Sequence, residues 1–323
     1  MLKELTIKNF RGIREGTLSD FGRVNILVGP NGCGKSTVLE AIYLAPVLTQ
    51  RDTDILGGSR QQFLIEHRNE AQDILPIKPG RVPQFWHFRS EPDNVIQITL
   101  RNNNGSGSEV GNMSAGDFSS NHGDVATDLD WLKFMDGLFF ATELHLMKDV
   151  EKMLGDALIA RRADKKIATL FREIYGLEME GLSFGKPGLL MALFPSEGVR
   201  IDDLGAGMRI SIRLMILLMS MRKTALLLEE FDAYQFPESL ETLARILVRS
   251  AKESEMQIIM TTHSMESIRS FLAACNLEGI PDFRLFPLVR TKDGTLRTKA
   301  LSLDATQELA AAGFDLRTLG SNE

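Results

Sequence analysis

The sequence predicts an α/β protein whose core is a mixed β-sheet. Three predominantly apolar runs, each typical of a strand buried on both faces, support this prediction: 24–28, 225–228 and 256–260. A glycine-rich turn follows the first run, and after it residues 38–44 carry apolar side chains at helical spacing. With 323 residues, the chain can bury a large core as one big domain or as two lobes.

The glycine-rich turn predicts a phosphate-binding P-loop. Residues 29–37 read GPNGCGKST, which fits the pattern G-x-x-x-x-G-K-[ST]. Glycines let successive backbone N–H groups point into one concavity that holds phosphate oxygens, and the helix that follows adds its positive end. We expect Lys35 to reach the β- and γ-phosphates and the Ser36 hydroxyl to ligate Mg²⁺. The expected nucleotide contacts in this loop are Asn31, Gly32, Cys33, Gly34, Lys35, Ser36 and Thr37.

Two acids end the second apolar run, where residues 223–230 read KTALLLEE. An apolar strand of this kind places a carboxylate at its C-terminal edge. We expect Glu229 to hold Mg²⁺ or one of its waters, and Glu230 to act as a general base toward the attacking water. A solvated strand end is the alternative for both acids. The third run ends in Thr-Thr-His-Ser, which places His263 at the end of another apolar strand.

Composition limits the classes of partner and compartment. The formal net charge is −6, so no global basic field indicates nucleic acid, although a local basic surface stays possible. Two cysteines give no disulfide framework, and we expect a reduced, cytoplasmic protein. No apolar run reaches the roughly 18 residues of a membrane span, so we expect no membrane partner.

Three further stretches carry predictions of local structure. Residues 85–88 and 95–100 flank Glu-Pro-Asp-Asn and predict a hairpin. Residues 102–130 are rich in Asn, Gly and Ser, and predict a mobile loop. Residues 149–175 predict one or two helices with a dense basic cluster, which is either a solvated face or a contact for a phosphate backbone.

The order of these features resembles an ABC-type ATPase of the SMC/RecF/OLD group, in particular an OLD-like ATPase domain without a nuclease domain. The resemblance begins with residues 5–13, LTIKNFRGI, before the P-loop. It implies that Arg11 lies beside the nucleotide phosphates, where the alternative is an ordinary surface arginine. It also implies that residues 204–207, LGAG, form the signature motif, with Gly205 in place of a common serine and Gly207 as the motif glycine. His263 matches the switch histidine of this group, and Glu229 takes the place of its usual aspartate.

The resemblance implies an ABC-type head, with an added antiparallel sheet and a helical lobe beside the P-loop sheet. We expect a single head over 1–323: lobe I from 1–100 and 222–323, a helical lobe with the signature at about 131–221, and the loop at 102–130 between them. In this group two heads enclose two ATP molecules with Mg²⁺, so we expect a homodimer or higher homo-oligomer. The group also has a loop with a functional glutamine, for which Gln50, Gln61, Gln62 and Gln84 are all candidates here.

Three functions fit these features. The first is an ATP-hydrolysing switch that dimerises through nucleotide and acts in DNA repair or anti-phage defence, with nucleic acid as a possible ligand and a separately encoded nuclease or toxin as effector. The second is a nucleotide-gated scaffold with little hydrolysis that sequesters such an effector. The third is an ABC transporter subunit, which the Asn-Phe-Arg start and the Gly-x-Gly signature disfavour.

Overall fold

The structure is a computed structural model. It describes residues 1–46, 59–60, 63–64, 88–90, 95–103, 109–113, 129–141, 158–159, 161–184 and 189–319. The gaps between these ranges include His67, His122, His145, Lys152 and all four candidates for the glutamine loop.

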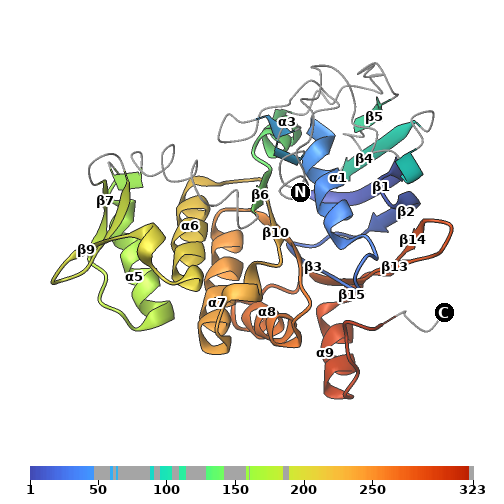
Figure 1. The fold of residues 1–323 in the computed structure, drawn as a ribbon. Coiled ribbons are helices and arrows are strands. Elements are labelled where there is room, and N and C mark those ends of the chain that lie inside the picture. Colours follow the sequence, from blue (N-terminus) through green and yellow to red (C-terminus); the bar gives the residue numbers. More distant parts are fainter. Residues whose placement is uncertain are drawn as a thin grey trace.

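A central, mostly parallel sheet confirms the predicted α/β core (Figure 1). Its strand order is β15-β12-β3-β11-β10-β6, in which β15 alone is antiparallel to its neighbour. The strands are β3 (Val24–Val28), β6 (Phe139–Ala141), β10 (Ala225–Glu229), β11 (Gln257–Thr261), β12 (Phe283–Pro287) and β15 (Leu301–Ser302). The three apolar runs of the sequence therefore lie side by side, in the order β3, β11 and β10.

Both faces of this sheet are buried, which explains why its strands are mostly apolar. In β10, Leu226 and Leu228 pack into one hydrophobic core, whereas Ala225 and Leu227 pack into the other. Alternate side chains of a strand point to opposite faces, so a strand between two cores is apolar on both faces. Two buried exceptions, Asn25 and Gln257, donate hydrogen bonds to backbone carbonyls.

The second sheet is the added one that the resemblance implies. Its order is β13-β14-β2-β1-β4-β5, and β1 pairs antiparallel with both β2 and β4. Its strands are β1 (Leu2–Phe10), β2 (Ile13–Ser19), β4 (Ile96–Asn102), β5 (Glu109–Met113), β13 (Val289–Arg290) and β14 (Thr295–Arg297). Helix α1 (Lys35–Leu44) contacts strands of both sheets and shares their common core.

Helices cover the opposite face of the central sheet (Figure 1). They are α6 (Ala206–Ser220), α7 (Pro237–Glu253) and α8 (Met265–Leu277). Beyond them lie α5 (Ala163–Tyr175) and a three-stranded antiparallel sheet of β7 (Gly181–Phe184), β8 (Leu190–Leu193) and β9 (Gly198–Arg200). The remaining elements are α3 (Leu129–Asp136), α9 (Leu303–Ala311) and the 3₁₀ turns η3 (Phe88–Ser90), η4 (Ile201–Asp203) and η5 (Phe231–Tyr234).

Several predicted details are wrong. Phe88 begins η3 instead of ending a strand, and the antiparallel partners of β4 are β1 and β5. β5 lies inside the stretch predicted as a loop, because backbone pairing with β4 needs no apolar side chains. Residues 129–141 pack with the P-loop sheet, since β6 pairs with β10 and α3 joins the core around α1. The predicted helical lobe also contains the strands β7, β8 and β9.

Neighbouring carboxylates and a backbone carbonyl partly compensate the positive charge of the basic cluster on α5. Lys165 donates to the Glu180 carbonyl over 2.6 Å, and Arg172 Nη2 lies 3.2 Å from a Glu178 carboxylate oxygen. Lys166 Nζ lies 3.9 Å from a Glu253 oxygen. These contacts favour a solvated helix face over a surface dedicated to phosphates.

Candidate functional site

The P-loop connects the end of β3 to the start of α1. Gly29 and Gly34 have φ angles of 143° and 107°, which L-residues with side chains rarely adopt. A Cβ at Gly29 would lie 2.6 Å from the Leu288 carbonyl oxygen, so the chain also passes too closely there for a larger residue. Lys35 Nζ donates to the carbonyls of Gly29 over 3.0 Å and Pro30 over 3.3 Å. The lysine is therefore held at the loop by neutral acceptors.

A cavity of about 420 Å³ opens over this loop. It combines residues from the P-loop, from the β1–β2 turn, from the ends of β10 and β11, and from β13. The lining residues are Arg11, Gly12, Asn31, Gly32, Gly34, Lys35, Ser36, Thr37, Glu230, His263 and Arg290. Since β3, β11 and β10 are parallel neighbours, their carboxyl ends meet at one edge, and this edge carries three of the contributing segments.

Glu230 and His263 form a pair at this edge. His263 Nε2 lies 3.3 Å from Glu230 Oε1, and the two side chains are 40% and 50% exposed respectively. Glu230 has a φ of 44°, an uncommon left-handed conformation for a residue with a side chain. Its N–H donates to the carbonyl and Oγ1 of Thr261 over 3.3 and 3.2 Å. The backbone thus turns the carboxylate out of the strand and toward the cavity.

A buried hydrogen-bond network supports the segment of His263. Thr262 Oγ1 donates to Asp232 Oδ2 over 2.6 Å, and the Ser264 N–H donates to Thr262 Oγ1 over 2.9 Å. Burial raises the pKa of Asp232, and the hydrogen bond from Thr262 opposes this shift. The network connects η5, which follows Glu230, to the residues on both sides of His263.

Arg11 reaches the cavity from the β1–β2 turn. Its Nε lies 2.7 Å from Glu40 Oε2, with Glu40 fully buried on α1 and the Arg11 side chain 12% exposed. Arg11 has a φ of 50°, and its guanidinium lies 5.6 Å from the centre of the Phe10 ring. The ion pair therefore connects this turn to the helix of the P-loop.

The signature residues lie apart from this cavity. Gly205 is the N-cap of α6 and Gly207 lies in its first turn, and neither lines the cavity. A Cβ at Gly207 would lie 2.6 Å from the Tyr234 carbonyl oxygen, so this glycine allows α6 to approach η5. The Gln235 amide donates to the Gly207 carbonyl over 3.1 Å and accepts a hydrogen bond from the Tyr175 hydroxyl over 3.1 Å.

Two other predicted residues do not line the cavity. The Cys33 side chain is buried in the core around α1, and burial raises the pKa of its thiol. Glu229 ends β10 and pairs in register with Thr261, one residue before the acid that faces the cavity. The Ser36 hydroxyl and the Glu229 carboxylate supply oxygen donors, which is the donor type that Mg²⁺ prefers. Among the described residues, no three His, Cys, Asp or Glu side chains gather into a metal cage.

Sequence reasoning missed three residues at or behind the site: Glu40, Gln235 and Arg290. Glu40 could have been noticed as a single acid inside the apolar run VLEAIYL of α1. Gln235 and Arg290 carry no local signal, because their positions depend on how distant segments pack.

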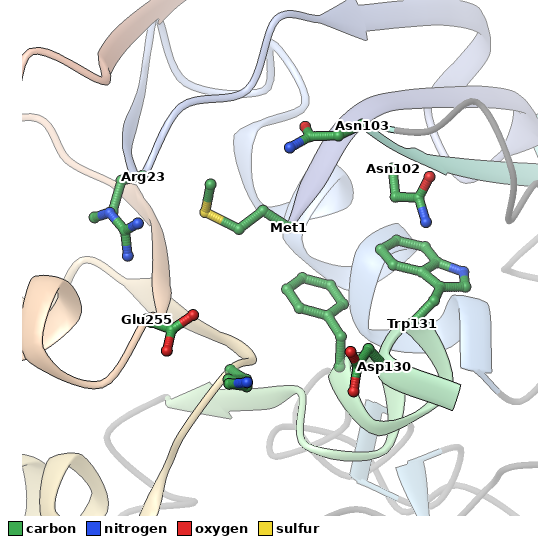
Figure 2. A pocket seen from close by; sticks show the side chains of 9 residues that line it. Met1, Arg23, Asn102, Asn103, Asp130, Trp131 and Glu255 are labelled. Carbon is green, nitrogen blue, oxygen red and sulfur yellow. The ribbon is translucent and has the colours of Figure 1, made fainter. Parts of the chain in front are cut away.

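A second cavity, of about 320 Å³, lies at the opposite ends of the central strands from the P-loop. Figure 2 shows Arg23 and Glu255 on one side of it and Asp130 and Trp131 on the other. Arg23 directly precedes β3, and Glu255 comes shortly before β11, so this cavity lies at the amino ends of the strands. None of the predicted site residues lines it.

A family model described as an AAA domain (AAA_23) matches residues 4–178. This match covers more than half of the 323 residues and includes the P-loop. The chain belongs to this family. Within the described part of the chain, no helix has both the length and the apolar character that crossing a membrane requires.

Relatives of known sequence and solved structures indicate which proteins within this family the chain is similar to. A stretch of 81 residues is 37% identical to the DNA replication and repair protein RecF of Pseudoalteromonas translucida and covers 24% of this chain and 22% of that protein. A second stretch of 114 residues, 35% of the chain, is 27% identical to the uncharacterized protein MJECL11 of Methanocaldococcus jannaschii, of which it covers 99%. An Smc head domain derived from Pyrococcus furiosus, solved with a ScpA domain, matches with a TM-score of 0.55 and 13% identity. The match covers 97% of this chain and 99% of that one. The AAA domain protein is an ABC-type ATPase of the SMC/RecF group with an SMC-head-like fold.

Proposed function

We propose that this AAA domain protein binds ATP with Mg²⁺ and hydrolyses it as a slow molecular switch. One observation carries the proposal: the P-loop, Lys35, Glu230 and His263 line a single cavity, although they come from three separate parts of the chain. The loop amides and Lys35 would bind the phosphates, while Ser36 and Glu229 would hold Mg²⁺, which supplies charge neutralisation when bound. Glu230 would accept a proton from the attacking water, and His263 would contact the γ-phosphate.

The position of the signature supports a nucleotide-bound dimer. Gly205 and Gly207 do not line their own chain's cavity, whereas a Cβ at Gly205 would meet no atom within 4 Å, so the N-terminus of α6 is open to a partner. In the dimer, this N-terminus would contact the ATP held by the second copy. ATP binds only the closed form of such an assembly tightly, so binding favours closure and hydrolysis reverses it.

The names of similar proteins support a proposal for the cellular role. One relative is named a DNA replication and repair protein, and one structural neighbour is an Smc head domain bound to the C-terminal domain of ScpA. We place this cytoplasmic switch in DNA repair or in anti-phage defence, where it would control a separately encoded nuclease or toxin. The signature LGAG supports an OLD-type member of the group.

Two variants test the switch. Lys35→Ala should abolish ATP binding, because the loop loses its cation and phosphate affinity depends on it. Glu230→Gln should keep ATP binding but slow turnover, so that the ATP-bound dimer accumulates in size-exclusion chromatography with MgATP. A Glu230→Gln protein that neither slows single-turnover ATP cleavage nor accumulates the dimer would show that the assignment of the base is wrong.

A nucleotide-gated scaffold with little hydrolysis is the second candidate. Glu229 stands where the group usually has aspartate, and it does not line the cavity, which favours a weak metal contact. In that case wild-type protein would bind MgATP and dimerise, but bound ATP would stay intact through a single-turnover experiment lasting hours.

A further inference from the structure

Arg290 reaches the candidate nucleotide cavity from the C-terminal part of the chain. It ends β13, which pairs with β14, and β14 in turn pairs parallel with β2. This order brings the arginine beside the β1–β2 turn, where it lines the same cavity as Arg11 and Lys35. No motif of the sequence contains it.

The β1–β2 turn is shaped around the Arg290 guanidinium. Arg290 Nη1 donates to the Gly12 carbonyl over 3.0 Å. A Cβ at Gly12 would lie 2.0 Å from the same Nη1, so any larger residue at position 12 would displace the guanidinium. The absence of a side chain at Gly12 therefore lets Arg290 lie at the wall of the cavity.

The three cations of the cavity differ in their partners. Arg11 is paired with the buried carboxylate of Glu40, and Lys35 donates to two loop carbonyls. Within the described ranges, Arg290 forms no ion pair, and the one hydrogen bond of its side chain goes to the neutral carbonyl of Gly12. A guanidinium has five N–H donors in a planar fork that fits phosphate oxygens, so Arg290 keeps both charge and donors for a ligand.

The charge of Arg290 also reaches the P-loop. Burial raises the pKa of the Cys33 thiol, while the charge of Lys35 and, more weakly, that of Arg290 oppose this rise. Arg290 thus acts on the same small volume as the loop lysine, although it comes from the other end of the chain.

From this placement we infer that Arg290 is a phosphate-binding residue of the nucleotide site. It would supply a third cation, from the β13–β14 hairpin, to the cavity that the P-loop also lines. The inference rests on the proposed function, because it names a further contact for the same triphosphate. Binding would then connect three segments through one ligand: the P-loop, the β1–β2 turn and the C-terminal hairpin.

Four variants of the full chain separate a phosphate contact from a structural one. Arg290→Gln keeps an amide that can donate to the Gly12 carbonyl but removes the charge, whereas Arg290→Lys keeps the charge. Arg290→Ala removes both. Arg297→Ala is the matched control, because Arg297 is exposed on β14 of the same hairpin and does not line this cavity. Melting temperatures without nucleotide establish that each variant folds.

The readout is the dissociation constant for MgATP, measured by isothermal titration calorimetry. Arg290→Gln and Arg290→Ala should each weaken binding by about tenfold or more, as expected for a lost hydrogen bond to a charged group. Arg290→Lys should retain most of the affinity, and Arg297→Ala should match wild type. Wild-type affinity in Arg290→Gln would overturn the inference and leave Arg290 as a support for the turn. Wild-type affinity in Lys35→Ala would instead overturn the proposed function itself.

Discussion

Replacing Arg11 with alanine should destabilise this protein far more than replacing an exposed arginine of the same sheet. The reason is the position of its partner, because the Glu40 side chain has no exposed surface and would lose the cation 2.7 Å away. Arg11 itself is 12% exposed at the cavity wall. The matched control is Arg101→Ala, since Arg101 forms a 3.0 Å ion pair with Glu4 at side-chain exposures of 54% and 29%.

The expected magnitudes differ several-fold. Two unit charges about 4 Å apart attract by about 4 kcal/mol at an effective dielectric constant of about 20. Breaking a buried pair by removing one partner costs about 3–5 kcal/mol in measured cases, whereas an exposed pair contributes up to about 1 kcal/mol. Arg11→Ala should therefore lower the free energy of unfolding by about 3–5 kcal/mol, and Arg101→Ala by about 1 kcal/mol or less.

Urea unfolding without nucleotide measures this difference. With an m-value of about 3 kcal/mol/M, the midpoint should fall by about 1–1.7 M for Arg11→Ala and by about 0.3 M or less for Arg101→Ala. The double variant Arg11→Met with Glu40→Leu should recover most of the lost stability, because apolar residues of similar volume replace a buried pair at little cost. It should not recover ATP binding. Equal midpoint shifts in the two single variants would refute the reasoning that this pair holds the turn onto α1.

Two further predictions concern the connections around the site. Gln235→Ala should cost about 1 kcal/mol of stability and slow multiple-turnover ATP hydrolysis without weakening ATP binding by the monomer, because it removes the hydrogen bonds to Gly207 and Tyr175; unchanged turnover in a coupled-enzyme assay would contradict this. In the β13–β14 turn, the pKa of Asp293 is lowered to about 2, first by a hydrogen bond from Thr291. A lowered pKa means that folding favours the ionised form, so Asp293 stabilises the protein above about pH 4 and this contribution is lost as the pH falls toward 2. The stability difference between wild type and Asp293→Asn should therefore shrink from pH 5 to pH 2.5 in urea titrations, and a constant difference would exclude the effect.

Much of the central sheet could be predicted because burial on both faces leaves a direct trace in the sequence. The runs that became β3, β10 and β11 are predominantly apolar, and each ends in residues of a different chemical type. Local chemistry also shapes the turn at Lys292-Asp293-Gly294, where a glycine with a φ of 89° follows an aspartate that accepts hydrogen bonds from neighbouring threonine hydroxyls. Local chemistry determines such strands and turns, so they can be predicted from the sequence before the fold is known.

The second sheet was harder to predict, because one of its strands leaves no pattern of apolar residues in the sequence. β5 reads EVGNM within a stretch rich in Asn, Gly and Ser, and its pairing with β4 is made by backbone groups that any sequence carries. Arg290 and Gln235 were not predictable from local patterns either. Each acts at a contact between segments far apart in the chain, and the sequence gives no sign of which carbonyl an arginine or glutamine will reach.

Gly207 shows how one residue can serve both the fold and the proposed switch. Its carbonyl accepts the Gln235 amide, and the space where its Cβ would lie is filled by the Tyr234 carbonyl, so the first turn of α6 rests on η5. η5 directly follows Glu230, and its Asp232 accepts the hydrogen bond of Thr262, the neighbour of His263. A shift of the α6 N-terminus on contact with a second copy's nucleotide would therefore reach the Glu230–His263 pair through a short chain of packed groups. By this path, hydrolysis in one copy would depend on the nucleotide held by the other.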